Sequence, residues 1–196
     1  LEQWLEIAPS VHIWISILLG KHPKTAEDIT SFWENWSSAT RPALSPQILT
    51  AGREDTISEI DHWLTTGATV FTFKADTQEE AVAFFAAFLY QKPIEERIQW
   101  LSRVLLVNDL ETLNQIGVSE NNLVLVPRFN PGNNVGLAIQ NGHSVLVPLG
   151  RGDSSSQSTP QLPRQHVGQI KEALLGLGID DERAQSLGTL ARRSLM

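Results

Sequence analysis

A strand that runs directly into an amphipathic helix, Ala68–Leu89 (ATVFTFKADTQEEAVAFFAAFL), is the feature that most constrains the fold. Its first part, Val70–Phe73, has the composition of a strand that is covered on both faces of a sheet. The connection Asp76–Glu80 carries three acids and no glycine. A phosphate-binding loop at such a turn needs the pattern GxxxxGK[ST], because its backbone N–H groups must wrap the phosphates. The segment therefore predicts a parallel α/β unit whose turn lacks phosphate-binding residues.

Three further apolar runs predict parallel strands at Val104–Val107, Leu123–Val126 and Val145–Val147. The segments between them have the apolar periodicity of helices. We expect an α/β fold, a doubly wound and mainly parallel sheet of four or five strands flanked by helices. A flavodoxin-like or Toprim-like fold differs from this expectation only in strand order, which periodicity does not supply.

The first third of the chain is rich in tryptophan and predicts helices, one of them in the apolar run Val11–Gly20. In TAEDITSFWENW, Thr25 and Asp28 have the spacing of helix caps. An aromatic stripe with helical periodicity follows, made of Ile29, Phe32, Trp33 and Trp36. We interpret it as core packing, the alternative being a platform for a ligand.

The chain divides into three predicted parts. Residues 1–45 form the tryptophan-rich helical segment, residues 46–150 the parallel α/β core, and residues 151–196 a polar loop followed by a helical lid. In the last part we expect Pro163 to start one helix and Asp180 to cap a second. Because the sequence begins with Leu1 and stops at Met196 in mid-pattern, we expect a piece of a larger protein.

Composition restricts the partners and the chemistry. The formal net charge of -7 argues against duplex nucleic acid or an anionic membrane as the main partner. The sequence has no cysteine, which excludes disulfides and thiolate-based sites. The run Val11–Gly20 is too short to span a membrane. We expect a cytoplasmic protein that binds other domains of its own polypeptide or other proteins.

Ligands of open parallel sheets bind at the carboxyl ends of the strands. At the first end, Thr77 and Glu80 predict a capping box that occupies the helix N-terminus. At the second, Asp109 resembles the magnesium-binding acid of a Walker B element, but we favour a helix cap. The third carries Arg128, for which a solvated turn is the preferred interpretation. The fourth carries Arg151 in an RGD tripeptide, to which we assign no function.

Other catalytic patterns are missing from the sequence. The five histidines show no metal-binding spacing such as HExxH, and no GxSxG or GxGxxG pattern opens a helix. We therefore predict no catalytic residue and no metal site.

Three segments together resemble the P-loop ATPases of the STAND and AAA+ type. AGREDTISEIDHWL (Ala51–Leu64) is similar to the GRE box and helix that lead into their nucleotide-binding core. The strand Val70–Phe73 follows where these proteins carry the Walker A strand, and the closing LGTLARRSLM is similar to their helical lid, whose arginine corresponds to Arg192 or Arg193. Because the Walker A glycines, lysine and serine or threonine are missing, the resemblance implies a pseudo-ATPase.

The sequence thus leads to two hypotheses. The first is a non-catalytic, STAND/AAA-like scaffold or interaction module of a larger bacterial signalling or defence protein, with no cofactor. The second is an atypical nucleotide-binding switch or weak NTPase that binds ATP and Mg²⁺. In the second, Asp109 holds the metal, and Arg53, Arg128 and Arg192 surround the nucleotide. We expect no enzymatic activity under the first hypothesis and weak activity under the second.

Overall fold

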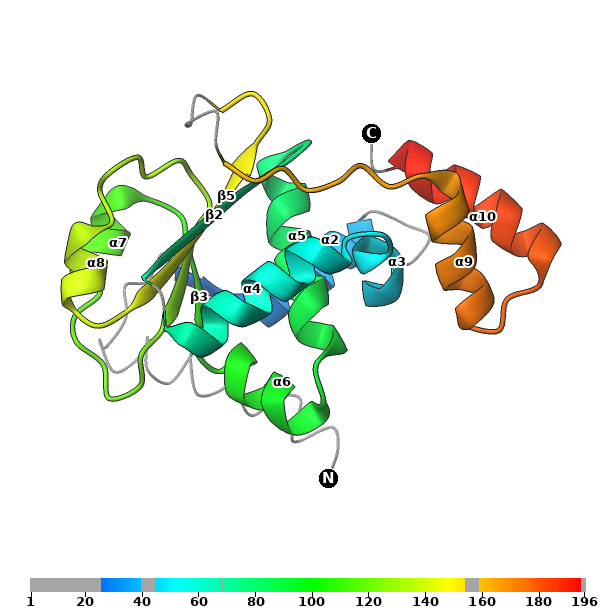
Figure 1. Cartoon of the computed structure of the whole chain (residues 1–196). Coiled ribbons are helices and arrows are strands. Elements are labelled where there is room, and N and C mark those ends of the chain that lie inside the picture. Colours follow the sequence, from blue (N-terminus) through cyan, green and yellow to red (C-terminus); the bar gives the residue numbers. More distant parts are fainter. Residues whose placement is uncertain (1–25, 40–44, 68, 154–158, 195–196) are drawn as a thin grey trace.

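The computed structural model describes residues 26–39, 45–67, 69–153 and 159–194 (Figure 1). The helix predicted for Val11–Gly20 and the cap predicted at Thr25 lie outside these residues. The side chains of Trp36, Arg192 and Arg193 also lie outside those that the structure describes.

One five-stranded sheet forms the centre of the fold, with the strand order β1-β3-β4-β5-β2. Four of its strands are parallel, β2 (Val70–Ala75), β3 (Val104–Val107), β4 (Val124–Pro127) and β5 (Ser144–Gly150). All four strands predicted from the apolar runs are confirmed, with shifted ends. In the flavodoxin-like order the first parallel strand lies between the second and the third. Here β2 pairs with β5 instead, so the flavodoxin-like alternative is wrong.

The fifth strand, β1 (Ala26–Asp28), pairs antiparallel with β3 and places Glu27 opposite Leu106. Asp28 precedes α2 and caps it, its Oδ1 accepting from the N–H of Ser31 at 2.8 Å. The spacing with Thr25 predicts Asp28 inside the first turn of a helix, and β1 occupies that position instead. The strand itself is not predicted, because its sequence AED has neither an apolar run nor β-branched residues. Its pairing comes from β3, whose edge it covers.

Helices cover both faces of the sheet (Figure 1). One face packs on a layer composed of α2 (Ile29–Ala39), α3 (Pro46–Thr50), α4 (Glu54–Thr66), α5 (Gln78–Gln91) and α6 (Ile94–Leu101). The other face packs on α7 (Leu110–Gln115) and α8 (Gly136–Gln140). Along β3, Leu106 belongs to the first core and Leu105 to the second. This alternation confirms the doubly wound α/β fold.

Helix α5 lies at the centre of the larger core. Every residue from Glu80 to Leu89 is buried, so this helix is covered on all sides instead of along one stripe. The aromatic residues Phe32 and Trp33 of α2 are also buried, and the Trp33 ring lies 5.6 Å from that of Tyr90 in α5. The core interpretation is therefore confirmed for these two residues.

The chain ends in a helical hairpin of α9 (Val167–Gly176) and α10 (Asp181–Ser194). Asp180 caps α10 as predicted, accepting from the N–H of Arg183 at 3.0 Å. The prediction that a helix starts at Pro163 is wrong, because α9 begins only after His166. Residues 159–165, which we call the strap, run along the outer edge of β2 instead. There the N–H of Leu162 donates to the carbonyl of Lys74 at 2.6 Å.

The hairpin lies beside α3, on the side of the molecule opposite α7 and α8 (Figure 1). Its apolar contact with the core runs through α9, where Ile170 and Leu174 are buried. In the described part of the chain, no helix is long and apolar enough to cross a bilayer.

Candidate functional site

The fold itself indicates where a ligand site belongs. The connection after β2 places α5 on one face of the sheet, whereas α7 and α8, which follow β3 and β4, lie on the other face. The helix after β2 therefore leaves the sheet on the opposite face from the helices after β3 and β4. Ligands of open α/β sheets bind at the carboxyl ends of strands where the connections change face, and we call the carboxyl ends at the border between β2 and β5 the switch point. Asp76 follows β2 at this border, and Arg151 follows β5.

The tripeptide Gly52-Arg53-Glu54, which we call the GRE box, supplies one side of this region. Gly52 has a φ of +70°, and its N–H donates to Oε1 of Glu54 at 3.1 Å. A Cβ on Gly52 would lie 2.1 Å from Nε2 of Gln169 in α9. Glycine suits the left-handed backbone here, and an added Cβ would require the terminal amide of Gln169 to shift.

The arginine of the GRE box is buried and has three acceptors. Its guanidinium donates to the carbonyl of Leu49 at 3.0 Å, to the carbonyl of Pro163 at 3.0 Å and to Oε1 of Glu80 at 2.5 Å. It also lies over the ring of Phe84, 5.5 Å from the centroid. Arg53 therefore joins α3, α5 and the strap, and its donors point to protein atoms.

The capping box predicted at the start of α5 is only half present. Oγ1 of Thr77 accepts from the N–H of Glu80 at 3.0 Å, as expected for the N-cap. The Glu80 carboxylate, however, accepts from the N–H of Asp76 at 3.0 Å and from Arg53. The buried charge of Arg53 explains this difference, because a buried guanidinium needs a carboxylate partner.

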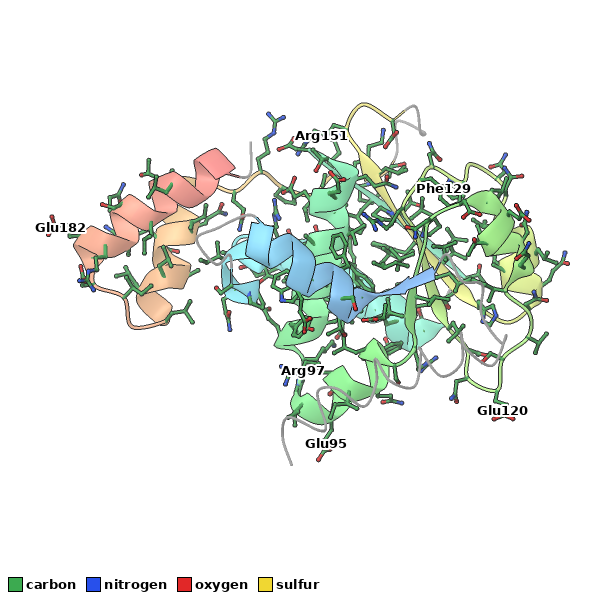
Figure 2. All side chains as sticks on the ribbon, turned by 180° about the vertical axis from the view of Figure 1, so that it is seen from behind. Glu95, Arg97, Glu120, Phe129, Arg151 and Glu182 are labelled. Atoms are coloured by element: carbon green, nitrogen blue, oxygen red, sulfur yellow. The ribbon has the colours of Figure 1, made fainter. Side chains whose placement is uncertain are left out.

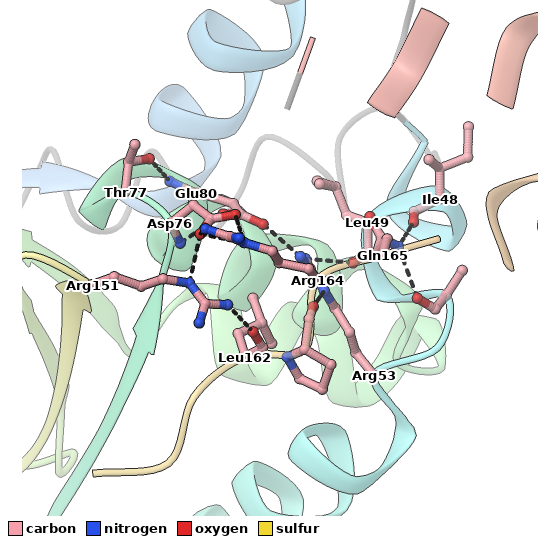
Figure 3. Close-up of polar contacts among 12 residues, drawn as sticks. Ile48, Leu49, Arg53, Asp76, Thr77, Glu80, Arg151, Leu162, Arg164 and Gln165 are labelled. Carbon is pink, nitrogen blue, oxygen red and sulfur yellow. Dashed lines mark hydrogen bonds and ion pairs between the residues drawn. The ribbon is translucent and has the colours of Figure 1, made fainter. Parts of the chain in front are cut away.

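Asp76 is held by two arginines that come from after β5 and from the strap (Figure 3). Its Oδ1 accepts from Nε of Arg151 at 2.5 Å and from Nε of Arg164 at 2.9 Å. The hydrogen bond from Arg164 lowers the pKa of Asp76, and that from Arg151 acts in the same direction against the effect of partial burial. The carboxylate thus occupies a two-arginine anion site at the switch point.

Four further hydrogen bonds complete the region. The ammonium of Lys74, which is buried, donates to the carbonyl of Asp153 at 3.1 Å. The Asp153 carboxylate accepts from the N–H of Gly150 at 2.6 Å. On the other side of the strap, Nε2 of Gln165 donates to the carbonyls of Ile48 and Ala51 at 2.5 and 2.8 Å.

These contacts leave the α5 N-terminus closed to a phosphate in the usual position. The first turn carries the carboxylates of Glu79 and Glu80, and Asp76 lies directly before it. An incoming phosphate would meet these negative charges, and it would have to replace Asp76 on its arginines. Nearby cations do exist, but Arg53, Arg151 and Lys74 already donate to protein acceptors.

The residues predicted to bind nucleotide do not converge on one place. Arg53 lies near the end of β2, whereas Asp109 and Arg128 follow β3 and β4, on the far side of β5. The Asp109 carboxylate caps α7, accepting from the N–H and the hydroxyl of Thr112 at 2.7 and 2.9 Å, as favoured from the sequence. Arg128 lies half-buried in the bend after β4, and its guanidinium is over the ring of Phe32, 5.4 Å from the centroid. Arg192 belongs to α10, and its side chain is not among those that the structure describes.

The sequence patterns missed the residues that do converge. No sequence pattern assigns a role to Arg164, and Arg151 stands in an RGD tripeptide to which we assign no function. Both are ordinary basic residues in a polar segment, and only the return of the strap to β2 brings them to Asp76. A signal of this pairing within the sequence itself would have to connect positions that are 75 and 88 residues apart.

Two cavities lie at the opposite, amino-terminal edge of the sheet. One of about 330 Å³ is lined by polar side chains that include Gln99, Arg103 and Glu120, and a neighbouring one of about 170 Å³ shares Arg103 with it. Figure 2 shows Glu120 and Arg151 at opposite ends of the sheet. Over the residues that the structure describes, no group of three or more acidic or histidine side chains is placed to hold a metal ion.

No protein-family model, no curated protein and no solved structure matches this chain. The functional assignment therefore depends on the geometry of the switch point.

Proposed function

We propose that the chain is a non-catalytic, STAND/AAA-like α/β module that serves as a scaffold or interaction module in a larger bacterial signalling or defence protein. The observation that carries this proposal is the state of the switch point. A carboxylate of the protein, that of Asp76, occupies the two-arginine site where an α/β domain of this kind would receive an anionic ligand.

The contacts of Arg53 in the GRE box support a structural role for this residue. Arg53 donates to α3, α5 and the strap at once, and it is 3% exposed. An arginine in this position stabilises the arrangement of three segments and has no solvent-facing donor geometry for a nucleotide. The atypical nucleotide-binding switch requires Arg53 and Asp109 to act together, although they lie at strand ends separated by β5 and β4.

Partners and location follow from the same proposal. The net charge of -7 opposes duplex nucleic acid, which attracts proteins with dense positive charge. We infer that the module works in the cytoplasm and contacts other domains of its polypeptide or other proteins.

Thermal unfolding with ATP or ADP and Mg²⁺ tests the non-catalytic assignment. A ligand at 100 times its dissociation constant stabilises a protein by about 2.7 kcal/mol, which raises the melting temperature measurably. We expect no shift up to millimolar nucleotide, and no phosphate release. A saturable shift that is retained in Asp109→Asn but lost in Arg151→Gln would place a nucleotide at the switch point and overturn the proposal.

A shift lost specifically in Asp109→Ser would instead support the metal-dependent alternative. Serine keeps a helix-capping oxygen and removes the carboxylate, so this variant separates capping from metal binding.

A further inference from the structure

The strap is attached to the core mainly through polar contacts. Its backbone pairs with Lys74 at two hydrogen bonds, from Lys74 N–H to Pro160 at 2.9 Å and from Leu162 N–H to Lys74 at 2.6 Å. Arg151 donates to the carbonyl of Leu162 at 2.9 Å, and Arg53 donates to that of Pro163 at 3.0 Å. These contacts join the strap to Lys74 of β2, to Arg151 after β5 and to Arg53 before α4.

Solvent reaches the ionic part of this attachment. The side chains of Arg164, Arg151 and Asp76 are 70%, 28% and 25% exposed. Exposed ion pairs are individually weak and are screened by salt. The apolar part of the strap's attachment is small, since Leu162 is the one strap side chain in the larger core.

The hairpin behind the strap joins the larger core through Ile170 and Leu174 of α9, with Ala184 of α10 buried in the same cluster. Helix α9 packs between α10 and α3, and α10 reaches the core mainly through α9 (Figure 1). At the end of the strap, Oε1 of Gln165 is buried and has no hydrogen-bond partner among the residues that the structure describes, which opposes docking. Segments with few apolar contacts and exposed polar ones open at a lower free energy than the whole domain.

Two of the three carboxylates around the start of α5, those of Asp76 and Glu80, are used to hold the strap. Asp76 binds Arg164 of the strap directly, and Glu80 orients Arg53, which donates to Pro163 (Figure 3). The switch point and the attachment of the hairpin are therefore the same set of residues. A change in the charge of Asp76 therefore alters the switch point and the attachment of the hairpin together.

We propose that the strap and the α9–α10 hairpin form a detachable unit, latched to the core by Asp76 between Arg151 and Arg164, and that the unit leaves while the sheet stays folded. Opening frees the N–H and the carbonyl of Lys74, which pair with the strap in the closed state. The outer edge of β2 is then available to another extended segment. This inference does not depend on whether a nucleotide binds.

Amide hydrogen exchange tests the latch on the whole chain. The N–H groups of Lys74 in β2 and of Leu162 in the strap, which we call the strap amides, report on the pairing of the strap with β2. The N–H of Val124 in the central strand β4 donates to the carbonyl of Arg103 at 2.8 Å and reports on the sheet. We expect the two strap amides to exchange at least about a hundredfold faster than Val124, because local opening precedes global unfolding. Raising the salt concentration should increase the strap rates and leave Val124 unchanged.

Two variants of matched chemistry identify the latch. Asp76→Asn removes the charge between the arginines, and we expect the strap amides to exchange about tenfold faster, the effect of losing a charge-assisted hydrogen bond. Asp61→Asn removes the surface carboxylate that pairs with Lys92, away from the strap, and should leave the strap rates unchanged.

Three results would overturn the proposal. The strap amides exchange at the rate of Val124 in the wild type, Asp76→Asn leaves them unchanged, or Asp61→Asn accelerates them equally. If Asp76→Asn does not fold, the salt dependence of the wild type decides, and strap rates that do not respond to salt reject the ionic latch.

Discussion

The guanidinium of Arg53 donates to the carboxylate of Glu80 at 2.5 Å, and the two side chains are only 3% and 9% exposed. Burial lowers the pKa of Arg53 from its ordinary value, and the charge of Glu80 opposes that change. Desolvation is thus the larger effect on this guanidinium. The pair lies where α3, α5 and the strap meet, so it links the GRE box to the segment that leads into the hairpin.

Replacing one member of this pair should be costly. Glu80→Leu leaves the Arg53 charge buried without a partner, and we expect the free energy of unfolding to fall by about 3 to 5 kcal/mol. The double variant Arg53→Met/Glu80→Leu should be more stable than Glu80→Leu, since it removes the isolated charge. Urea unfolding followed by circular dichroism measures all three proteins. A double variant less stable than Glu80→Leu would show that the hydrogen bonds of Arg53 outweigh its desolvation.

Acid should weaken the Asp76 network. Because the folded-state pKa of Asp76 lies below its unfolded value, the carboxylate contributes stability at neutral pH. That contribution is complete above the unfolded pKa, near 4, and is lost as the pH falls through the lower folded-state value. The stability difference between wild type and Asp76→Asn should therefore be constant from pH 7 to about 5 and shrink below about 4.

Urea unfolding of the two proteins at a series of pH values measures this difference. Asp61→Asn is the control for a general effect of removing a carboxylate. A difference between wild type and Asp76→Asn that persists unchanged into the acid range would mean that the charge of Asp76 is not what stabilises the strap.

Two glycines with the same left-handed backbone allow the cost of backbone strain to be measured apart from the cost of a side-chain contact. Gly52 and Gly67 have φ values of +70° and +68°, but only Gly52 has atoms of another element within 4 Å of an added Cβ. Gly67→Ala should cost about 1 to 2 kcal/mol from the left-handed backbone alone. Gly52→Ala should cost more, because the methyl group displaces the terminal amide of Gln169, whose Oε1 accepts from the N–H of His166.

A double-mutant cycle with Gln169→Ala isolates that displacement. The loss in Gly52→Ala should be smaller when Gln169 is already alanine, and the coupling should be absent for Gly67→Ala. Equal losses at the two glycines would show that Gln169 moves aside freely, and that α9 does not depend on the GRE box.

The sequence predicts the local parts of this fold because local patterns determine them. Apolar runs marked β2 to β5, and Asp109 and Asp180 cap α7 and α10 as predicted. The three residues of β1 have no strand pattern, and their conformation comes from pairing with β3. Strand order likewise depends on contacts between distant segments, as in the pairing of β2 with β5.

The site was harder to predict for the same reason. Arg53 stood out through the GRE box, but its partner Glu80 was assigned to a capping box, since a spacing of three residues is visible and a buried pair across 27 positions is not. The conformation of the strap was mispredicted for the same reason. Pro163 is a good residue for a helix start, yet its carbonyl is the acceptor for Arg53, and α9 begins later.

Asp109 offers a direct test of cap against metal ligand. Its two carboxylate oxygens accept from the N–H and the hydroxyl of Thr112. Asp109→Ala should lower the free energy of unfolding by about 1 kcal/mol, the usual cost of losing an N-cap, whereas Asp109→Ser should stay within a few tenths of wild type. Added Mg²⁺ should leave the unfolding midpoints of all three proteins unchanged. A magnesium-dependent rise in wild type that both variants lack would assign the carboxylate to a metal, since serine keeps the cap but supplies no charge for the cation.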